Sequence, residues 1–265
     1  MRFASLGSGS DGNSLVVESS DGVRVTRVLI DCGFSLREAR RRLRGAGIEP
    51  DEIDAIVVTH EHGDHVGGVF RVSAAHDIPV FLTHGTLAAS LGDADLAPRA
   101  DEMSLVRRIT PDRSFEVGGM RITPVAVPHD AKEPVQYVID DGRCKLGVLT
   151  DLGHASAHVR RSYSGLDALV LECNHDADML ASNARYPDVL KRRISGPWGH
   201  LANHAAAELL ASLDTSRLRV LVAAHLSRQN NSPELARQAL AQALASELQA
   251  VGVADQDAGF EWTEV

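Results

Sequence analysis

Short apolar runs alternate with helical patterns along the whole 265-residue chain. Runs of about four to eight residues rich in Val and Ile are typical of buried strands, and apolar residues spaced three or four apart are typical of helices. The runs predict strands at residues 14–18, 24–31, 53–59, 80–83, 121–127, 135–140, 145–150, 168–172 and 218–224. The spacing predicts helices at residues 36–44, 66–76, 155–163, 187–194, 203–213 and 233–250. This order predicts an α/β (α+β) fold, built as a layered sandwich rather than as a doubly wound parallel sheet.

Neither a linker nor an internal repeat divides the chain, so we expect residues 1–265 to form a single domain. The composition, with 44% hydrophobic and 24% charged residues, excludes disordered and fibrous classes. Cys32, Cys144 and Cys173 are odd in number and lack CxxC spacing, which argues against a disulfide framework and a thiolate zinc site. The chain shows neither a signal-peptide pattern nor a run of about 20 apolar residues. We therefore expect a cytoplasmic protein that does not contact membranes, with its oligomeric state open.

The distribution of positive charge matters more than its sum. A net charge of -9 argues against broad, sequence-independent coating of nucleic acid. However, Arg37, Arg40, Arg41 and Arg44 share one face of a predicted helix, and a second cluster covers residues 191–193. Each cluster can follow a phosphate backbone, and the alternative for each is a solvated helix face paired with acids.

Four potential metal ligands lie within the six residues His60-Glu61-His62-Gly63-Asp64-His65, directly after the predicted strand at 53–59. In an extended segment, His60 and His62 project to the same side because side chains two apart share a face. Asp64 and His65 lie on the turn into the next helix and can face a second point. The hexapeptide therefore predicts two neighbouring metal positions, and imidazole and carboxylate ligands without thiolate suit zinc, manganese or iron.

Further ligands must come from other strand ends, because one hexapeptide cannot fill two sites. His129, Asp151 and His225 each follow a predicted strand. The ends of strands are where α/β folds gather ligands at one edge of the sheet. We therefore expect these three residues to complete the sites.

These motifs resemble those of the metallo-β-lactamase-fold hydrolases. The hexapeptide matches the second motif of that superfamily, while Asp31, His129, Asp151 and His225 match the first, third, fourth and fifth. The resemblance implies a four-layer αββα sandwich with two divalent metal ions at one edge. It assigns His60, His62 and His129 to one metal, Asp64, His65 and His225 to the other, and Asp151 to a bridge between them. Asp31 is expected to accept a hydrogen bond from a ligand imidazole and thereby fix its tautomer.

Longer segments are similar to the YycJ (WalJ) family. They are residues 7–14, 29–33, 172–176, 185–187, 190–194, 199–203 and 224–227. Members of this family act as 5′-to-3′ DNA exonucleases, so the resemblance implies phosphodiester hydrolysis, with DNA favoured over RNA as the substrate but RNA left open. Two neighbouring metals lower the pKa of a water molecule between them, so we expect a metal-bridging hydroxide as the nucleophile. The alternative is a small-molecule hydrolase of the same fold, acting on a cyclic phosphodiester or, like glyoxalase II, on a thioester. A non-catalytic binding module would require missing ligands, and the motifs are complete.

The remaining candidate residues surround this centre. Asp64 is expected to share a proton as well as to ligate, and His200 to donate to the leaving oxygen or bind phosphate; the alternative for His200 is a plain helix-start residue. His175 has two interpretations, as a support of a ligand or as a structural residue. Trp198 is a candidate to stack on a base, or a half-buried packing residue. The predicted substrate-binding residues are Lys191, Arg192, Arg193 and Asn203.

Overall fold

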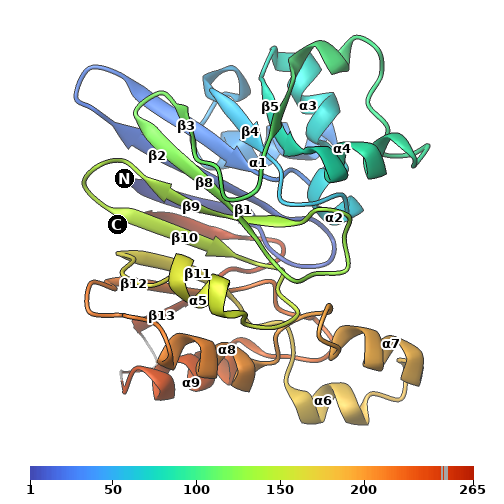
Figure 1. Ribbon diagram of the computed structural model, residues 1–265, viewed down its shortest axis with the longest axis vertical. Helices are drawn as coiled ribbons and strands as arrows, with labels where there is room; N and C mark the ends of the chain where they lie inside the picture. The colour runs from blue at the N-terminus through green and yellow to red at the C-terminus, as the bar shows by residue number, and fades with distance from the viewer. Residues whose placement is uncertain (246, 248–249) are drawn as a thin grey trace.

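Two seven-stranded sheets form the centre of the computed structural model, which describes residues 1–245, 247 and 250–265 (Figure 1). In spatial order, the first sheet contains β14 (Phe260–Glu264), β1 (Arg2–Gly7), β2 (Ser14–Ser20), β3 (Val25–Ile30), β4 (Ala55–Val57), β5 (Val80–Thr83) and β6 (Val106–Ile109). The second contains β13 (Val251–Val253), β12 (Val220–Ala224), β11 (Ala168–Glu172), β10 (Lys145–Leu149), β9 (Val135–Asp140), β8 (Met120–Ala126) and β7 (Phe115–Val117). Both sheets mix parallel and antiparallel pairs.

The two sheets pack face to face around one apolar core. Alternate residues along each strand point between the sheets, because strand side chains repeat every two residues. Val17, Val28 and Val57 of the first sheet therefore meet Tyr137 and Val148 of the second in one fully buried cluster. The hydroxyl of Tyr137 donates to the carbonyl of Val58 at 2.7 Å, which joins the sheets by a buried hydrogen bond.

Helices cover the outer face of each sheet. On the first sheet lie α1 (Leu36–Gly45), α3 (Val69–His76) and α4 (His84–Leu91). On the second lie α5 (Ala157–Ser162), α8 (Asn203–Ala211) and α9 (Pro233–Ala243). These layers confirm the predicted αββα sandwich. Among the described residues, no helix has both the length and the apolar character needed to cross a bilayer.

Several elements differ from the sequence prediction. The helix predicted at 66–76 begins earlier and is broken into α2 (Gly63–Val66) and α3. The break falls at Gly67-Gly68, where a Cβ on Gly68 would lie 1.8 Å from the carbonyl oxygen of Phe34. The helix predicted at 233–250 ends at Ala243, and positions 246 and 248–249 of that prediction lie outside the described residues. The prediction missed β1, β6, β7, β13, β14, α4 and α6 (Ala177–Ser182).

The arrangement brings six strand ends to one edge of the sandwich. Strands β3 and β4 run parallel in the first sheet, as do β10, β11 and β12 in the second, and β8 runs in the same direction as β10. Their carboxyl ends therefore meet on the right of Figure 1, near α2 and α7 (Asp188–Ile194). The segments that follow these strands carry the predicted ligands.

Candidate metal centre

Three histidines form the first donor set at this edge. His60 Nε2 lies 3.0 Å from His62 Nδ1, and His129 Nε2 lies 3.4 Å from the same atom. The three ligand atoms all lie within 4.8 Å of one another. Ligands held about 2 Å from a shared cation necessarily lie about 3–4 Å apart, so this spacing fits a metal.

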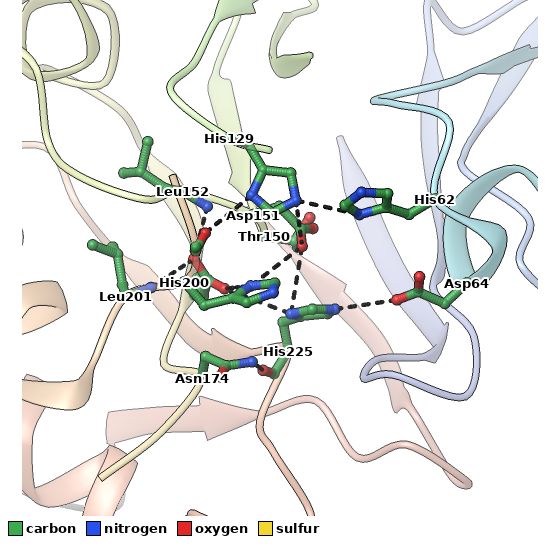
Figure 2. Close-up of polar contacts among 12 residues, drawn as sticks. His62, Asp64, His129, Thr150, Asp151, Leu152, Asn174, His200, Leu201 and His225 are labelled. Carbon is green, nitrogen blue, oxygen red and sulfur yellow. Dashed lines mark hydrogen bonds and ion pairs between the residues drawn. The ribbon is translucent and has the colours of Figure 1, made fainter. Parts of the chain in front are cut away.

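A second donor set lies beside the first. His65 Nε2 is 3.4 Å from Asp64 Oδ2, and His225 Nε2 is 3.6 Å from the same oxygen. Figure 2 shows His225 between Asp64 and Asp151, with His62 and His129 on the opposite side of Asp151. Four ligands of the two sets come from the end of β4 and from α2, and the other two, His129 and His225, come from segments far away in sequence.

Asp151 lies between the two sets. Its Oδ2 is 3.2 Å from His65 Nε2, and its Oδ1 is 3.8 Å from His129 Nε2. Asp151 Oδ2 and both ring nitrogens of His225 are buried without a hydrogen-bond partner in the part of the chain that the structure describes. Unsatisfied buried polar atoms are costly, so three of them on two residues of the predicted ligand set indicate an absent ligand. The predicted residues thus form donor clusters that fit divalent metal ions at this edge of the sandwich.

The outer nitrogen of several ligand histidines is hydrogen-bonded away from the centre. His65 Nδ1 contacts Asp31 Oδ2 at 2.8 Å, and His129 Nδ1 donates to the carbonyl of Gly199 at 3.0 Å. The Thr59 hydroxyl contacts His60 Nδ1 at 2.9 Å and also donates to Asp31. Such bonds fix the tautomer that leaves the inner nitrogen free for a metal. The structure therefore places Asp31 where the sequence prediction expected it, against a ligand imidazole.

Two residues of the centre adopt a left-handed backbone conformation that is unusual for residues other than glycine. Asp31 has φ 58° and His225 has φ 57°. Asp31 is held by the amide of Thr59, which donates to its carboxylate at 2.8 Å, and the amide of His225 donates to the hydroxyl of Ser8 at 2.9 Å. Backbone strain that the surroundings enforce in this way is concentrated at functional sites.

The charges of the donor sets depend on one another. Burial opposes ionisation of Asp151, but the neighbouring His225 and His65 outweigh it and hold the pKa of this carboxyl well below its usual value. Burial likewise opposes protonation of His225, yet Asp151, Asp64 and Glu172 raise its pKa to about 10. The pKa of His60 moves the other way, because burial and the charge of His65 both lower it. Without cations, protons therefore gather on the second set.

Gly33 allows the hexapeptide loop to approach β3. A Cβ at this position would lie 1.9 Å from the carbonyl oxygen of Asp64. We expect Gly33→Ala to lower the free energy of unfolding by about 3 kcal/mol, because backbone atoms cannot yield as a side chain can. It should also reduce the metal content by displacing Asp64. Thermal unfolding and metal analysis test this, with Gly45→Ala as control, since a Cβ there meets nothing within 4 Å; equal stability of the two variants would contradict it.

A cleft of about 250 Å³ opens above the centre. Its floor contains Asp64, Asp151 and His225, and one wall is formed by α7 and the segment before it, through Tyr186 and Arg193. Arg193 Nε contacts Asp130 Oδ2 at 2.6 Å, which orients the guanidinium at the rim. This wall therefore presents the aromatic ring of Tyr186 and the positive charge of Arg193 to the same cleft as the donor sets.

The other predicted substrate residues lie elsewhere. Lys191 and Arg192 line a separate cavity on the far side of His200. Asn203 was predicted to bind substrate, but it is buried and its side chain exchanges hydrogen bonds with that of Asn231 at 2.8 and 2.9 Å. Its amide ties the start of α8 to the start of α9, so that prediction is corrected. Trp198 is 57% exposed and packs edge-on against His154, outside the residues that line the cleft.

Three of the four arginines in the first cluster have side-chain partners. On α1, Arg41 contacts Glu38 and Arg44 contacts Glu49 at 3.0 Å, while Arg40 donates to His76. Ser35 caps this helix by accepting from the Glu38 amide, and the Glu38 side chain pairs with Arg41 and Arg42. The solvated, acid-paired alternative describes this face.

His200 faces the cleft and is held by a residue that the sequence analysis did not select. Its Nδ1 lies 2.7 Å from Glu172 Oε1, while Glu172 Oε2 accepts from the amides of Leu152 and Leu201. Glu172 is fully buried, and a carboxylate at the end of an apolar strand was a signal that could have identified it. Asn13 was also missed: its side-chain amide contacts Asp64 Oδ2 at 3.2 Å and His65 Nε2 at 3.0 Å.

Comparisons with known proteins agree with this geometry. A family model described as a beta-lactamase superfamily domain matches residues 26–225. The chain is 32% identical over 262 residues to an exodeoxyribonuclease YycJ of Bacillus anthracis, covering 96% of this chain and 93% of that protein. It is 30% identical over 252 residues to an exodeoxyribonuclease WalJ of Streptococcus pneumoniae, covering 95% and 91%.

Solved structures show the same fold. Zinc-bound PqqB from Methylobacterium extorquens has a TM-score of 0.74 at 19% identity, and the match covers 100% of each chain. The metallo-β-lactamase-fold protein YhfI from Bacillus subtilis has a TM-score of 0.72 at 17% identity, with 99% of each chain covered. The fold, the full-length relatives and the donor sets together show that this chain belongs to the metal-dependent hydrolases of the metallo-β-lactamase superfamily, within the YycJ/WalJ family.

Proposed function

We propose that this protein is a metal-dependent phosphodiesterase that removes nucleotides from DNA in the 5′-to-3′ direction. The observation that carries the proposal is the position of Asp151, whose carboxylate lies near His65 of one donor set and His129 of the other, on the floor of a cleft with a cationic and aromatic wall. The full-length relatives are named exodeoxyribonucleases, which supports DNA rather than RNA as the substrate. We also propose that residues 1–265 act as one domain in a reducing cytoplasm, where the three buried cysteines stay free.

The proposed cofactors are two divalent cations, zinc or manganese, with iron as a further candidate. His60, His62 and His129 would hold one, Asp64, His65 and His225 the other, and Asp151 both. When bound, the cations would lower the pKa of the attacking water, so that it ionises more easily to hydroxide, and would neutralise charge that develops on the phosphate. Donors of nitrogen and oxygen without sulfur suit these metals.

The chain's own residues position the reactants. Arg193, oriented by Asp130, can bind a non-bridging phosphate oxygen at the rim. Asp64 Oδ2 lies in the floor of the cleft beside His65 and is placed to hold the proton of the attacking water. Nδ1 of His200 donates a hydrogen bond to Glu172, so Nε2 of that ring is the nitrogen presented to the leaving oxygen.

His200→Ala is expected to lower turnover by about 10²-fold or more, because a positioned proton donor contributes about that much. Metal content should stay unchanged, since His200 lies outside the two donor sets that are assigned to the cations. Glu172→Gln should give a smaller loss, because it leaves the ring in place but weakens its orientation. Steady-state rates and metal analysis test this against His154→Ala, an exposed histidine that contacts the carbonyl of Pro197. Unchanged turnover of His200→Ala would remove this residue from the mechanism.

The activity can be tested by offering metal-reconstituted protein four substrates in parallel. These are end-labelled single-stranded DNA, the matching RNA, a cyclic dinucleotide and a thioester. We expect DNA to be shortened stepwise from its 5′ end, as read on a sequencing gel. Thioester turnover without any phosphodiester cleavage would overturn the proposal.

A small-molecule phosphodiesterase is the second candidate, favoured by the limited cleft volume of about 250 Å³ and the net charge of -9. The two functions differ in their dependence on salt. Binding of a DNA strand weakens steeply with added salt because several phosphates release counterions, whereas one small phosphodiester shows a shallow dependence. A plot of log KM against log salt concentration therefore separates them.

A further inference from the structure

A second cavity, of about 450 Å³, lies on the far side of His200 from the metal centre. It is lined by α6, by α7 and by the first residues of α8, and it shares His200 as a wall with the cleft above the metal centre. None of the roles assigned above uses it. Because one imidazole separates the two spaces, a ligand in this cavity would lie within the reach of a single nucleotide from the reacting phosphate.

The cavity has a surplus of positive charge. Lys191 and Arg192 line it from α7, against one carboxylate, Asp188. Lys191 Nζ donates to the carbonyl of Ala181 at 2.6 Å, which holds the ammonium at the rim without neutralising it. The neighbouring Arg193 pairs with Asp130, whereas Arg192 lines the cavity and forms no ion pair with any residue that the structure describes. Both cations are therefore available to an anion.

The start of α8 adds backbone donors. Ala202, at the N-cap, carries no side chain that could accept from the first turn. The backbone amide of Asn203 donates to the carbonyl of His175, but the backbone amides of His204 and Ala205 have no acceptor within the helix. Ala202, His204 and Ala205 all line the cavity. An uncapped helix start with free N–H groups attracts anions, phosphate in particular.

His175 points to the kind of anion. It lines the cavity, is only 2% exposed, and contacts Asn174 Oδ1 through Nδ1 at 3.3 Å. The Asn174 amide nitrogen donates to the carbonyl of His225, so the Asn174 oxygen must accept from Nδ1 and leaves Nε2 of His175 as an acceptor. A terminal phosphomonoester, with a second pKa of about 6, can share a proton with such a nitrogen, whereas a phosphodiester has none to share.

We propose that this cavity binds the terminal 5′-phosphate of the DNA strand, while the next phosphate along lies over the metal centre. This inference rests on the proposed nuclease function and deepens it, because the cavity would select the end from which degradation starts. Arg192 and Lys191 balance the two charges of the monoester, and the amides of α8 and His175 bind its oxygens.

The test compares three oligonucleotides of one sequence, bearing a 5′-phosphate, a 5′-hydroxyl or a 3′-phosphate. For the metal-loaded wild-type protein we expect KM to be about tenfold to a hundredfold lower for the 5′-phosphate, the gain typical of charge-assisted hydrogen bonds. Fluorescence anisotropy of the full chain in chelator should show the same preference without turnover. Arg192→Ala and Lys191→Ala should bring the ratio of the two KM values towards one, and Arg161→Ala, on α5, should not.

Ala202→Asp is the sharpest variant. An Asp at the N-cap accepts from the first turn and should keep α8 folded, while its charge occupies the anion site. We therefore expect the preference for the 5′-phosphate to disappear with the melting temperature maintained. Equal binding of all three ends by the wild type, a preference for the 3′-phosphate, or a preference that survives Ala202→Asp would overturn the assignment. Absence of any DNA cleavage, with the binding preference intact, would instead overturn only the proposed nuclease activity.

Discussion

Replacement of Asp151 by Ala is expected to lower phosphodiester hydrolysis by about 10³-fold or more, since preorganised charge at a reacting phosphate contributes about this much or more. The reason is its position: Oδ2 faces His65 at 3.2 Å and Oδ1 faces His129 at 3.8 Å, so one side chain serves both donor sets. Its loss should remove metal as well as activity, and the metal-to-protein ratio should fall from near two. Asp151→Asn should behave similarly, because an amide cannot supply the negative charge.

The control for Asp151→Ala is a buried aspartate far from the cleft. Asp141 lies in the turn between β9 and β10, at the opposite end of the strand that Asp151 follows, and it pairs with the N-terminal ammonium at 3.4 Å. Asp141→Asn should cost stability, measured by thermal unfolding, but keep metal content and turnover. If Asp151→Ala kept its metal and turned over DNA at the wild-type rate, the shared-ligand account would be wrong.

The strand pattern was predictable because the buried strands are apolar on both faces. In β4 and in β11 up to its final Glu172, for example, every residue is buried between the other sheet and a helix layer, and the sequence shows this as an uninterrupted apolar run. Edge strands lack this signal. Strand β6 reads Val-Arg-Arg-Ile and β14 reads Phe-Glu-Trp-Thr-Glu, with mostly partly exposed residues, and their pairing partners define them rather than their own composition.

The ligand positions were predictable because ligands follow strands, and strand ends converge. The substrate residues were harder to place, since Lys191 and Arg193 are two apart on α7 and point into different cavities. A cluster of positive charge predicts that phosphate is attracted. The side of His200 on which the phosphate binds depends on the path of the chain between α6 and α8. Asn203 illustrates the same limit, because its partner Asn231 is distant in sequence.

The affinity for divalent cations is expected to fall by about two orders of magnitude for each pH unit below neutrality, because two protons compete with the metal. In the metal-free protein the carboxylates of Asp151 and Asp64 outweigh burial and raise the pKa of His65 well above its ordinary value, and that of His225 to about 10. Both rings are therefore protonated at pH 7 and must lose that proton before they ligate. Isothermal titration in buffers of different ionisation enthalpy should detect release of about two protons at pH 7.

The same two histidines give the stability of the metal-free protein the opposite pH dependence: it falls as the pH rises, whereas the metal affinity rises. A histidine whose pKa is raised by folding contributes stability that is complete below its unfolded value of about 6.5 and is lost as the pH rises through the folded value. For His225 that window extends from about 6.5 to about 10. The melting temperature of the chelated protein should therefore fall across this window, while that of the metal-loaded protein should not. His225→Gln should reduce the number of protons released on metal binding to about one. If the wild type released almost none, both rings would already be neutral at pH 7, and the neighbouring carboxylates would not raise their pKa as stated.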